Sequence, residues 1–150
     1  MEPIAAITAI TAIASGLRLI DQFRDLVLRF KQVKMTPPSA TMEQTENGII
    51  LKEKEPDREV EVKAEDLKLD QWDSVRYDAL RRRVDIKWRL YHELWSQTPL
   101  LSEDEKARIK LRMETIQKEL CEDFHQMGDI YERTMNKPLP DHYTLHEICG

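Results

Sequence analysis

Glycine and cysteine are scarce in this sequence. The 4 glycines are isolated from one another, which excludes the glycine-rich loop that cradles a phosphate in many nucleotide-binding proteins. The 2 cysteines, Cys121 and Cys149, are too few for a disulfide framework, so we expect free thiols in a reducing, cytosolic setting. Hydrophobic residues make up 41% of the 150 residues and charged residues 34%, a combination typical of long solvated helices.

The sequence also lacks the combinations of residues that support catalysis. His92-Glu93 has no second histidine at the spacing of a zinc protease motif. Cys121 and His125 lie one helical turn apart, but no electropositive surroundings that would activate the thiol accompany them. The sequence therefore predicts a protein that is not an enzyme and binds no cofactor.

An excess of positive charge is missing as well. The formal net charge of -5 argues against non-specific nucleic-acid binding, which needs a positive surface. Residues 76–91 do interleave basic and aromatic side chains, which can grip nucleic acid through phosphate contacts and stacking. However, Asp73, Asp78 and Asp85 lie among them, and the aromatic positions follow the period of a buried helix face. We expect a solvated helix face here and no nucleic-acid partner.

The N-terminal region has no charged residue between Glu2 and Arg18. A secretory signal would begin with a positively charged region, which is not found here. The uncharged stretch from Pro3 to Leu17 is shorter than the roughly 20 residues with which a helix crosses a bilayer. We therefore expect neither a signal peptide nor a conventional transmembrane span.

Hydrophobic periodicity and turn residues divide the chain into long helices and one short β-hairpin. Three segments have apolar residues every three or four positions, as in amphipathic helices. Val60 and Val62 alternate with charged residues, as in a half-exposed strand. We predict a single domain over residues 1–150, built from a helix over 3–34, a polar linker over 36–48, a β-hairpin over 49–63, helices over 64–97 and 102–136, and a C-terminal strap over 137–150.

The last two helices are expected to pair. Ser102 followed by Glu105 is a capping-box signature, and only about five residues separate the two helices, so they must be antiparallel neighbours. Trp72 lies on the apolar period of the first of them, and from Ile109 to Tyr131 the second keeps coiled-coil spacing. The predicted fold is mainly all-α, an elongated three-helix bundle with an antiparallel coiled-coil-like hairpin and a small inserted β-hairpin.

Isoleucine recurs at every third residue near the N-terminus, at Ile4, Ile7, Ile10 and Ile13. Because a helix turns by about 100° per residue, the stripe that they form rotates through about 180°. A helix tip that is apolar on nearly every side is normally covered. Three covers remain open: the chain's own hairpin or strap, a second copy or protein partner, and a lipid surface. We predict Ile4, Ile7, Ile10, Ile13 and Leu17 as partner-binding residues.

The opening, Met-Glu-Pro followed by an Ala/Ile-rich helix, resembles the start of some fungal HeLo-type cell-death domains over about the first 20 residues. The resemblance implies a membrane-active first helix. The basic residues that follow the apolar tip would suit an anionic lipid surface, although Asp21 and Asp25 lie among them.

The C-terminal strap contains one weak candidate for a metal site. His142 and His146 are four residues apart, which on a helix places both imidazoles on one face, and Cys149 follows three residues later. A short tail after prolines is a poor platform, and no second cluster completes four ligands. We therefore expect ordinary tail residues and no bound metal.

These features predict a non-enzymatic protein–protein interaction module or assembly subunit. Its Ile/Ala-rich N-terminal helix would self-associate, giving a homo-oligomer, or dock another protein. The alternative is a membrane-acting effector of the cell-death or defence type, whose N-terminal helix inserts into lipid. The expected location is cytoplasmic, with a peripheral position at a membrane under the alternative.

Overall fold

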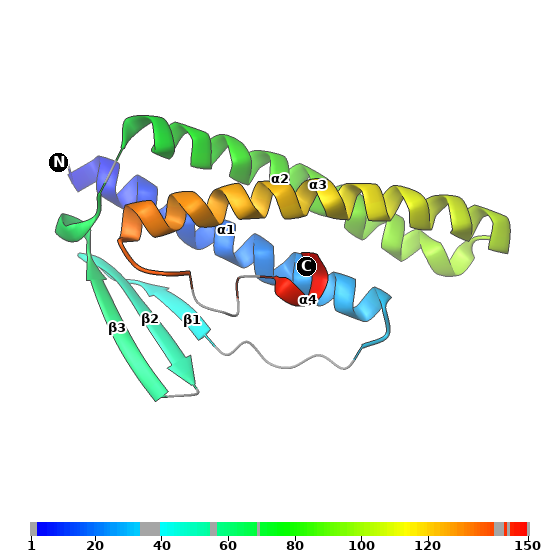
Figure 1. Cartoon of the computed structure of the whole chain (residues 1–150), viewed down its shortest axis with the longest axis horizontal. Helices are drawn as coiled ribbons and strands as arrows, with labels where there is room; N and C mark the ends of the chain where they lie inside the picture. Colours follow the sequence, from blue (N-terminus) through cyan, green and yellow to red (C-terminus); the bar gives the residue numbers. More distant parts are fainter. Residues whose placement is uncertain are drawn as a thin grey trace.

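Three long helices lie side by side, and a small sheet lies at one end of the bundle (Figure 1). The computed structural model describes residues 3–33, 40–54, 57–68, 70–139, 143 and 145–149, and it describes the side chains of the first helix from Ile10 onward. The helices are α1 (Pro3–Phe30), α2 (Gln71–Gln97) and α3 (Glu103–Met135). The predicted fold class is confirmed, because the chain is mainly helical and α2 and α3 form a long antiparallel pair.

The first helix ends earlier than residue 34, the predicted boundary. Gln32 adopts a left-handed conformation with φ of 56°. The amide of Val33 donates to the carbonyl of Leu28, and the amide of Gln32 donates to the carbonyl of Arg29. This is the Schellman arrangement that satisfies the last carbonyls of a helix, so Phe30 is the final helical residue of α1.

The sheet contains one strand more than the predicted hairpin. Its strands are β1 (Ala40–Gln44), β2 (Gly48–Lys54) and β3 (Asp57–Lys63), antiparallel in the order β1-β2-β3. The β2–β3 hairpin is confirmed, but the prediction of a linker over 36–48 is wrong for β1. The polar sequence of β1 conceals it, since Met42 is its one large apolar residue. A third strand stabilises a ribbon that would be marginal with two.

One face of the sheet belongs to the core of the bundle. Ile49, Leu51 and Val62 are buried, whereas Glu59 and Glu61 on the alternate positions are exposed. The pairing of Ile49 with Val62 brings these apolar side chains to the same face. The sheet therefore covers part of α1 and positions it against the helical pair.

The second long helix begins later than residue 64, the predicted start. Ala64–Asp66 form a short 3-10 turn, η1, and α2 begins only at Gln71. The carboxylate of Asp70 accepts from the amides of Trp72 at 2.8 Å and Asp73 at 3.3 Å, which caps the helix. The Asp70 cap lies inside the segment that the apolar pattern predicted as helix, and it therefore sets the start of α2.

The predicted start of α3 is confirmed. The Ser102 hydroxyl accepts from the amide of Glu105 at 3.3 Å and donates to its carboxylate at 3.0 Å, so the predicted Ser–Glu pair caps the helix. The helix ends at Asn136, whose φ of 55° is the left-handed conformation of a helix C-cap. Its buried residues include the predicted seam, at Met113, Ile116, Leu120, Phe124, Met127 and Tyr131.

Gly16 on α1 lies directly against side chains of α2 and α3. A Cβ atom at this position would lie 2.6 Å from Met127 Cε and would also meet the Tyr77 hydroxyl. The absence of a side chain thus allows α1 to settle between α2 and α3. Ile10 and Ile13, the described isoleucines of the predicted apolar tip, belong to the core of the bundle.

Candidate functional site

The predicted partner-binding residues of α1 are buried where the structure describes them. Ile10, Ile13 and Leu17 belong to the hydrophobic core, whereas the side chains of Ile4 and Ile7 lie outside the described part. For the three described residues the chain itself supplies the cover, mainly from α2 and with a smaller share from the sheet and α3, and not from the hairpin or strap alone as the first alternative had it. A direct role in binding a partner stays a prediction, and it would require α1 to leave the bundle.

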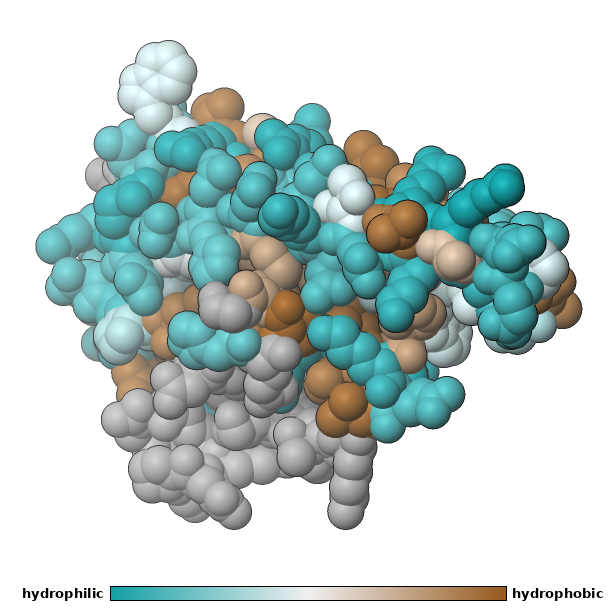
Figure 2. All heavy atoms as spheres, turned by 45° about the vertical axis from the view of Figure 1, so that its right-hand side comes forward, coloured by the Kyte–Doolittle hydropathy of each residue, from teal (hydrophilic) through white to brown (hydrophobic). Residues whose placement is uncertain are grey.

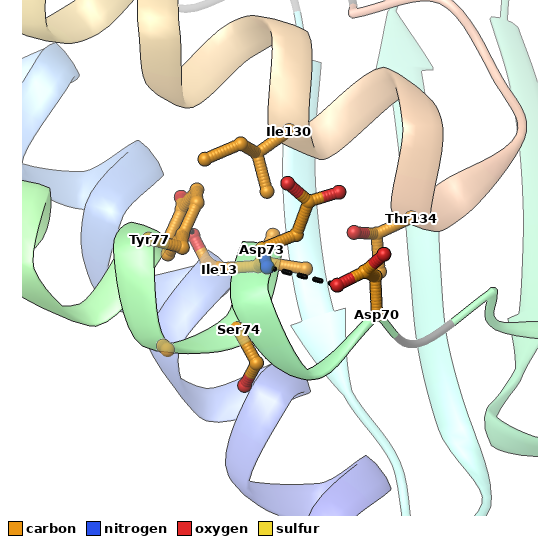
Figure 3. A pocket seen from close by; sticks show the side chains of 8 residues that line it. Ile13, Asp70, Asp73, Ser74, Tyr77, Ile130 and Thr134 are labelled. Atoms are coloured by element: carbon orange, nitrogen blue, oxygen red, sulfur yellow. Dashed lines mark hydrogen bonds between the residues drawn. The ribbon is translucent and has the colours of Figure 1, made fainter.

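A small cavity of about 20 Å³ lies beside the α1 tip, between all three helices (Figure 3). It has the volume of about one water molecule. Asp73 at its edge is held by Arg133 at 2.9 Å, and this hydrogen bond lowers the pKa of the Asp73 carboxyl. Asp70 caps α2. Tyr77, whose pKa burial raises, donates to the carbonyl of Ile13 at 3.3 Å. These polar groups serve the fold and leave no room for a substrate.

The predicted weak metal candidate does not form a site. Cys149 is joined to Cys121 in a disulfide with a Cα–Cα distance of 5.8 Å, so its sulfur is not a free thiolate. His146 is exposed, and His142 lies outside the described residues. Within the described ranges, no group of three histidine, cysteine, aspartate or glutamate side chains is arranged to hold a metal ion.

The disulfide also overturns the expectation of two free thiols. Cys121 lies on α3, and Cys149 ends the short helix α4 (His146–Cys149), 28 residues later. Residue spacing gave no signal for this pairing, because it depends on how the C-terminal strap folds back on α3. Oxidised Cys121 also cannot act as the nucleophile that was considered with His125.

A larger cavity, of about 150 Å³, lies between α3 and the C-terminal residues. Phe124, Leu139, Tyr143 and Leu145 supply apolar walls, and the disulfide lies at its border. Its volume is below the roughly 300 Å³ at which small-molecule pockets usually begin. The cavity therefore indicates loose packing beneath the C-terminal residues rather than a substrate pocket.

Basic residues of α2 form ion pairs within the α2–α3 pair. The carboxylate of Asp123 on α3 is 1% exposed and contacts Arg83 Nη2 at 2.7 Å and Lys87 Nζ at 3.2 Å. Tyr77 and Tyr91 are buried, so their rings cannot stack on bases. The structure thus supports a role for this region in joining α2 to α3.

Four small or apolar residues are exposed on the side of α2 that faces away from α1 and α3. They are Trp72, Val75, Ala79 and Ile86, here named the α2 outer stripe, with Trp72 84% and Ile86 67% exposed. The interpretation of Trp72 as a core residue is wrong. Ile86 was the sequence signal for this exposed stripe. It lies between the buried residues Val84 and Tyr91 along the chain but not on their side of the helix, so the helix has a second apolar face. On the surface drawn in Figure 2, brown apolar patches likewise alternate with teal hydrophilic side chains.

Among the described residues, no helix is both long enough and apolar enough to cross a membrane. Comparisons of the chain with protein-family models, with curated proteins and with solved structures found no match.

Proposed function

We propose that the protein is a non-enzymatic interaction module or assembly subunit, and that it self-associates through the α2 outer stripe. The observation that carries this proposal is the exposure of the Trp72 indole on a helix whose other side is already buried. Tryptophan is among the side chains that contribute most to interfaces, because its large apolar surface gains free energy when it is removed from water. A second copy of the chain is the proposed occupant.

The stripe is compatible with two-fold symmetry. Trp72 and Ile86 each lie seven residues from Ala79, which is the smallest residue in the stripe. In an antiparallel pair of α2 helices centred on Ala79, Trp72 of each copy would pack against Ile86 of the other. Such a contact is self-complementary, as a closed dimer requires, and alanine at the crossing lets the backbones approach.

Two of the arginines beside the stripe are balanced by neighbouring carboxylates. Arg82 is paired with Asp78 at 3.0 Å, and Arg89 with Asp85 at 3.1 Å. Both pairs join residues one turn apart on α2, so each arginine is balanced within its own helix. The stripe spans about 21 Å and covers less than the roughly 800 Å² per partner of a standard interface. We therefore expect a weak and reversible dimer.

Light scattering without detergent, over a range of protein concentrations, tests the proposal. The mass of the full chain should rise from 17.7 kDa towards twice that value as the concentration increases. Ile86→Asp should remain a monomer, because it places a charge in the proposed interface. Leu111→Asp is the matched control, since Leu111 on α3 is also 67% exposed, and it should behave like the unchanged chain. A chain that is monomeric at every concentration, or equal effects of the two variants, would refute self-association through α2.

The Ile/Ala-rich segment remains the second proposed docking surface, for a protein or for lipid. No charged residue lies in α1 before Arg18, and Ile10, Ile13 and Leu17 would meet lipid once α1 had left the bundle. A membrane-acting effector of this kind predicts that vesicles of anionic lipid leak on addition of the full chain. A cross-link between α1 and α2 should abolish the leakage. Leakage that persists with the cross-link in place would contradict insertion of α1.

The cytoplasmic location stays part of the proposal. Reducing compartments keep most structural thiols free, so the Cys121–Cys149 disulfide provides the test. Alkylation of the thiols in intact cells, followed by mass measurement, separates the two states. Two alkylated cysteines would support the cytoplasmic location, and a protein population in which the disulfide is fully formed would indicate an oxidising compartment.

A further inference from the structure

The C-terminal residues of the chain are docked on the bundle and covalently fastened at their end. Tyr143, Leu145 and Ile148 are buried, although α4 is only four residues long. The Gln117 side-chain amide on α3 donates to the carbonyl of Ile148 at 3.1 Å. Figure 1 shows α4 against the middle of the bundle, away from the sheet. We call Tyr143 together with residues 145–149 the C-terminal segment.

Two features indicate that this segment is held under constraint. Leu145 has a φ of 57°, a left-handed conformation that is unfavourable for leucine and persists only where the surroundings enforce it. The cavity of about 150 Å³ lies beneath the segment, between Phe124 on α3 and the side chains of Tyr143 and Leu145. The cavity is partly open at the surface, so the contact between the segment and α3 is incomplete. Packing alone is therefore an incomplete explanation for the docked position.

The disulfide supplies the missing restraint. It joins Cys149 to the buried Cys121 across a separation of 28 residues. A cross-link of this kind removes many open conformations from the ensemble, and so favours the docked state over the undocked one. Without it, the strain at Leu145 and the incomplete contact with α3 would both favour release.

We propose that the Cys121–Cys149 disulfide is a redox latch, which a dithiol reductant opens and which releases the C-terminal segment from the groove beside α3. A thiolate of the reductant attacks Sγ of Cys149, the less buried of the two residues, and forms a mixed disulfide while Cys121 leaves as a thiolate and takes up a proton. The second thiol of the reductant then displaces Cys149 as its thiol. In total, two electrons and two protons pass to the protein, and the reductant becomes a disulfide.

Release of the segment changes the surface of the molecule. Phe124, Tyr143 and Leu145 in the cavity wall are buried while the latch is closed, and they become accessible when it opens. The latch is independent of the α2 outer stripe, because its parts lie on α3 and at the C-terminus. It also gives the disulfide a role in a compartment where the thiols are reduced for part of the time.

Hydrogen–deuterium exchange of the full chain, oxidised or reduced with dithiothreitol, tests the latch at a concentration where the chain is monomeric. Reduction should speed exchange in peptides that cover Leu145 and Ile148 by roughly tenfold or more. Peptides from residues 84–94 should not change. The Cys149→Ser variant should match the reduced chain under both conditions.

Two outcomes would overturn the proposal. Equal protection of the C-terminal segment in the oxidised and reduced chains would mean that packing alone holds it. A similar increase of exchange in residues 84–94 would mean that the disulfide stabilises the whole fold and is not a local latch. Circular dichroism of Cys149→Ser provides the control for folding, since loss of helical signal would assign the second outcome.

Discussion

Replacement of both cations that contact Asp123 is expected to destabilise the α2–α3 hairpin by much more than the sum of the two single replacements. The carboxylate is 1% exposed and is contacted by Arg83 and Lys87 from α2. Arg83→Met and Lys87→Met each remove one charge while they retain much of the apolar stem. After either single change, one cation still balances Asp123. After both changes, the carboxylate has lost the two cations that balance it.

The magnitudes follow from the exposure of each group. Arg83 is 59% exposed and Lys87 also contacts Glu119 at 3.4 Å, so each single variant should lower the free energy of unfolding by about 1 kcal/mol. An uncompensated buried charge costs about 3–5 kcal/mol. The double variant should therefore lose about 3–5 kcal/mol, which leaves a coupling of about 1–3 kcal/mol between the two positions.

Urea unfolding of the four chains at neutral pH measures this coupling. Arg82→Met is the control, because Arg82 is 73% exposed and pairs with Asp78 at the surface, and its effect should stay below about 0.5 kcal/mol. Addition of Asp123→Leu to the double variant should recover most of the lost stability, since no charge then remains buried. Additive effects of Arg83→Met and Lys87→Met would show that the two cations do not compensate for each other at Asp123.

Three further changes test other parts of the fold. Gly16→Ala should lower the free energy of unfolding by about 1–3 kcal/mol, because the methyl group meets the Tyr77 hydroxyl; an unchanged thermal midpoint would contradict this. Ser102→Ala removes both hydrogen bonds to Glu105 and should cost about 1 kcal/mol in urea titration, whereas Ser96→Ala, within the exposed end of α2, should cost less. Burial raises the pKa of Tyr91 to about 12, and it also raises the pKa of the other three tyrosines. Because tyrosines of the unfolded chain ionise near about pH 10, stability should be complete below that pH and fall as the pH rises to about 12. Tyrosinate absorbance that increases without loss of helical circular dichroism would refute the last prediction.

Local patterns were sufficient for much of the fold. The capping box at Ser102 and the three-and-four spacing of α3 predicted a helix that the structure confirms. The alternation of Val60 and Val62 predicted a strand in the same way. These signals are readable because hydrogen bonds within one helix turn and the two faces of one strand depend on residues close in sequence. The lengths of the long helices and the short connection after α2 then implied the antiparallel pair.

The candidate sites depended on contacts between distant segments. The same apolar period includes the buried Leu80 and the exposed Trp72, and the positions of α1 and α3 decide which face of α2 is covered. The disulfide joins residues 28 positions apart and forms because the C-terminal segment returns to α3. Sequence by itself determined which segments become helices and strands, since that choice is made by neighbouring residues. Tertiary structure decided which apolar surfaces are hidden and which thiols meet, because burial and proximity depend on the packing of segments that the chain places far apart.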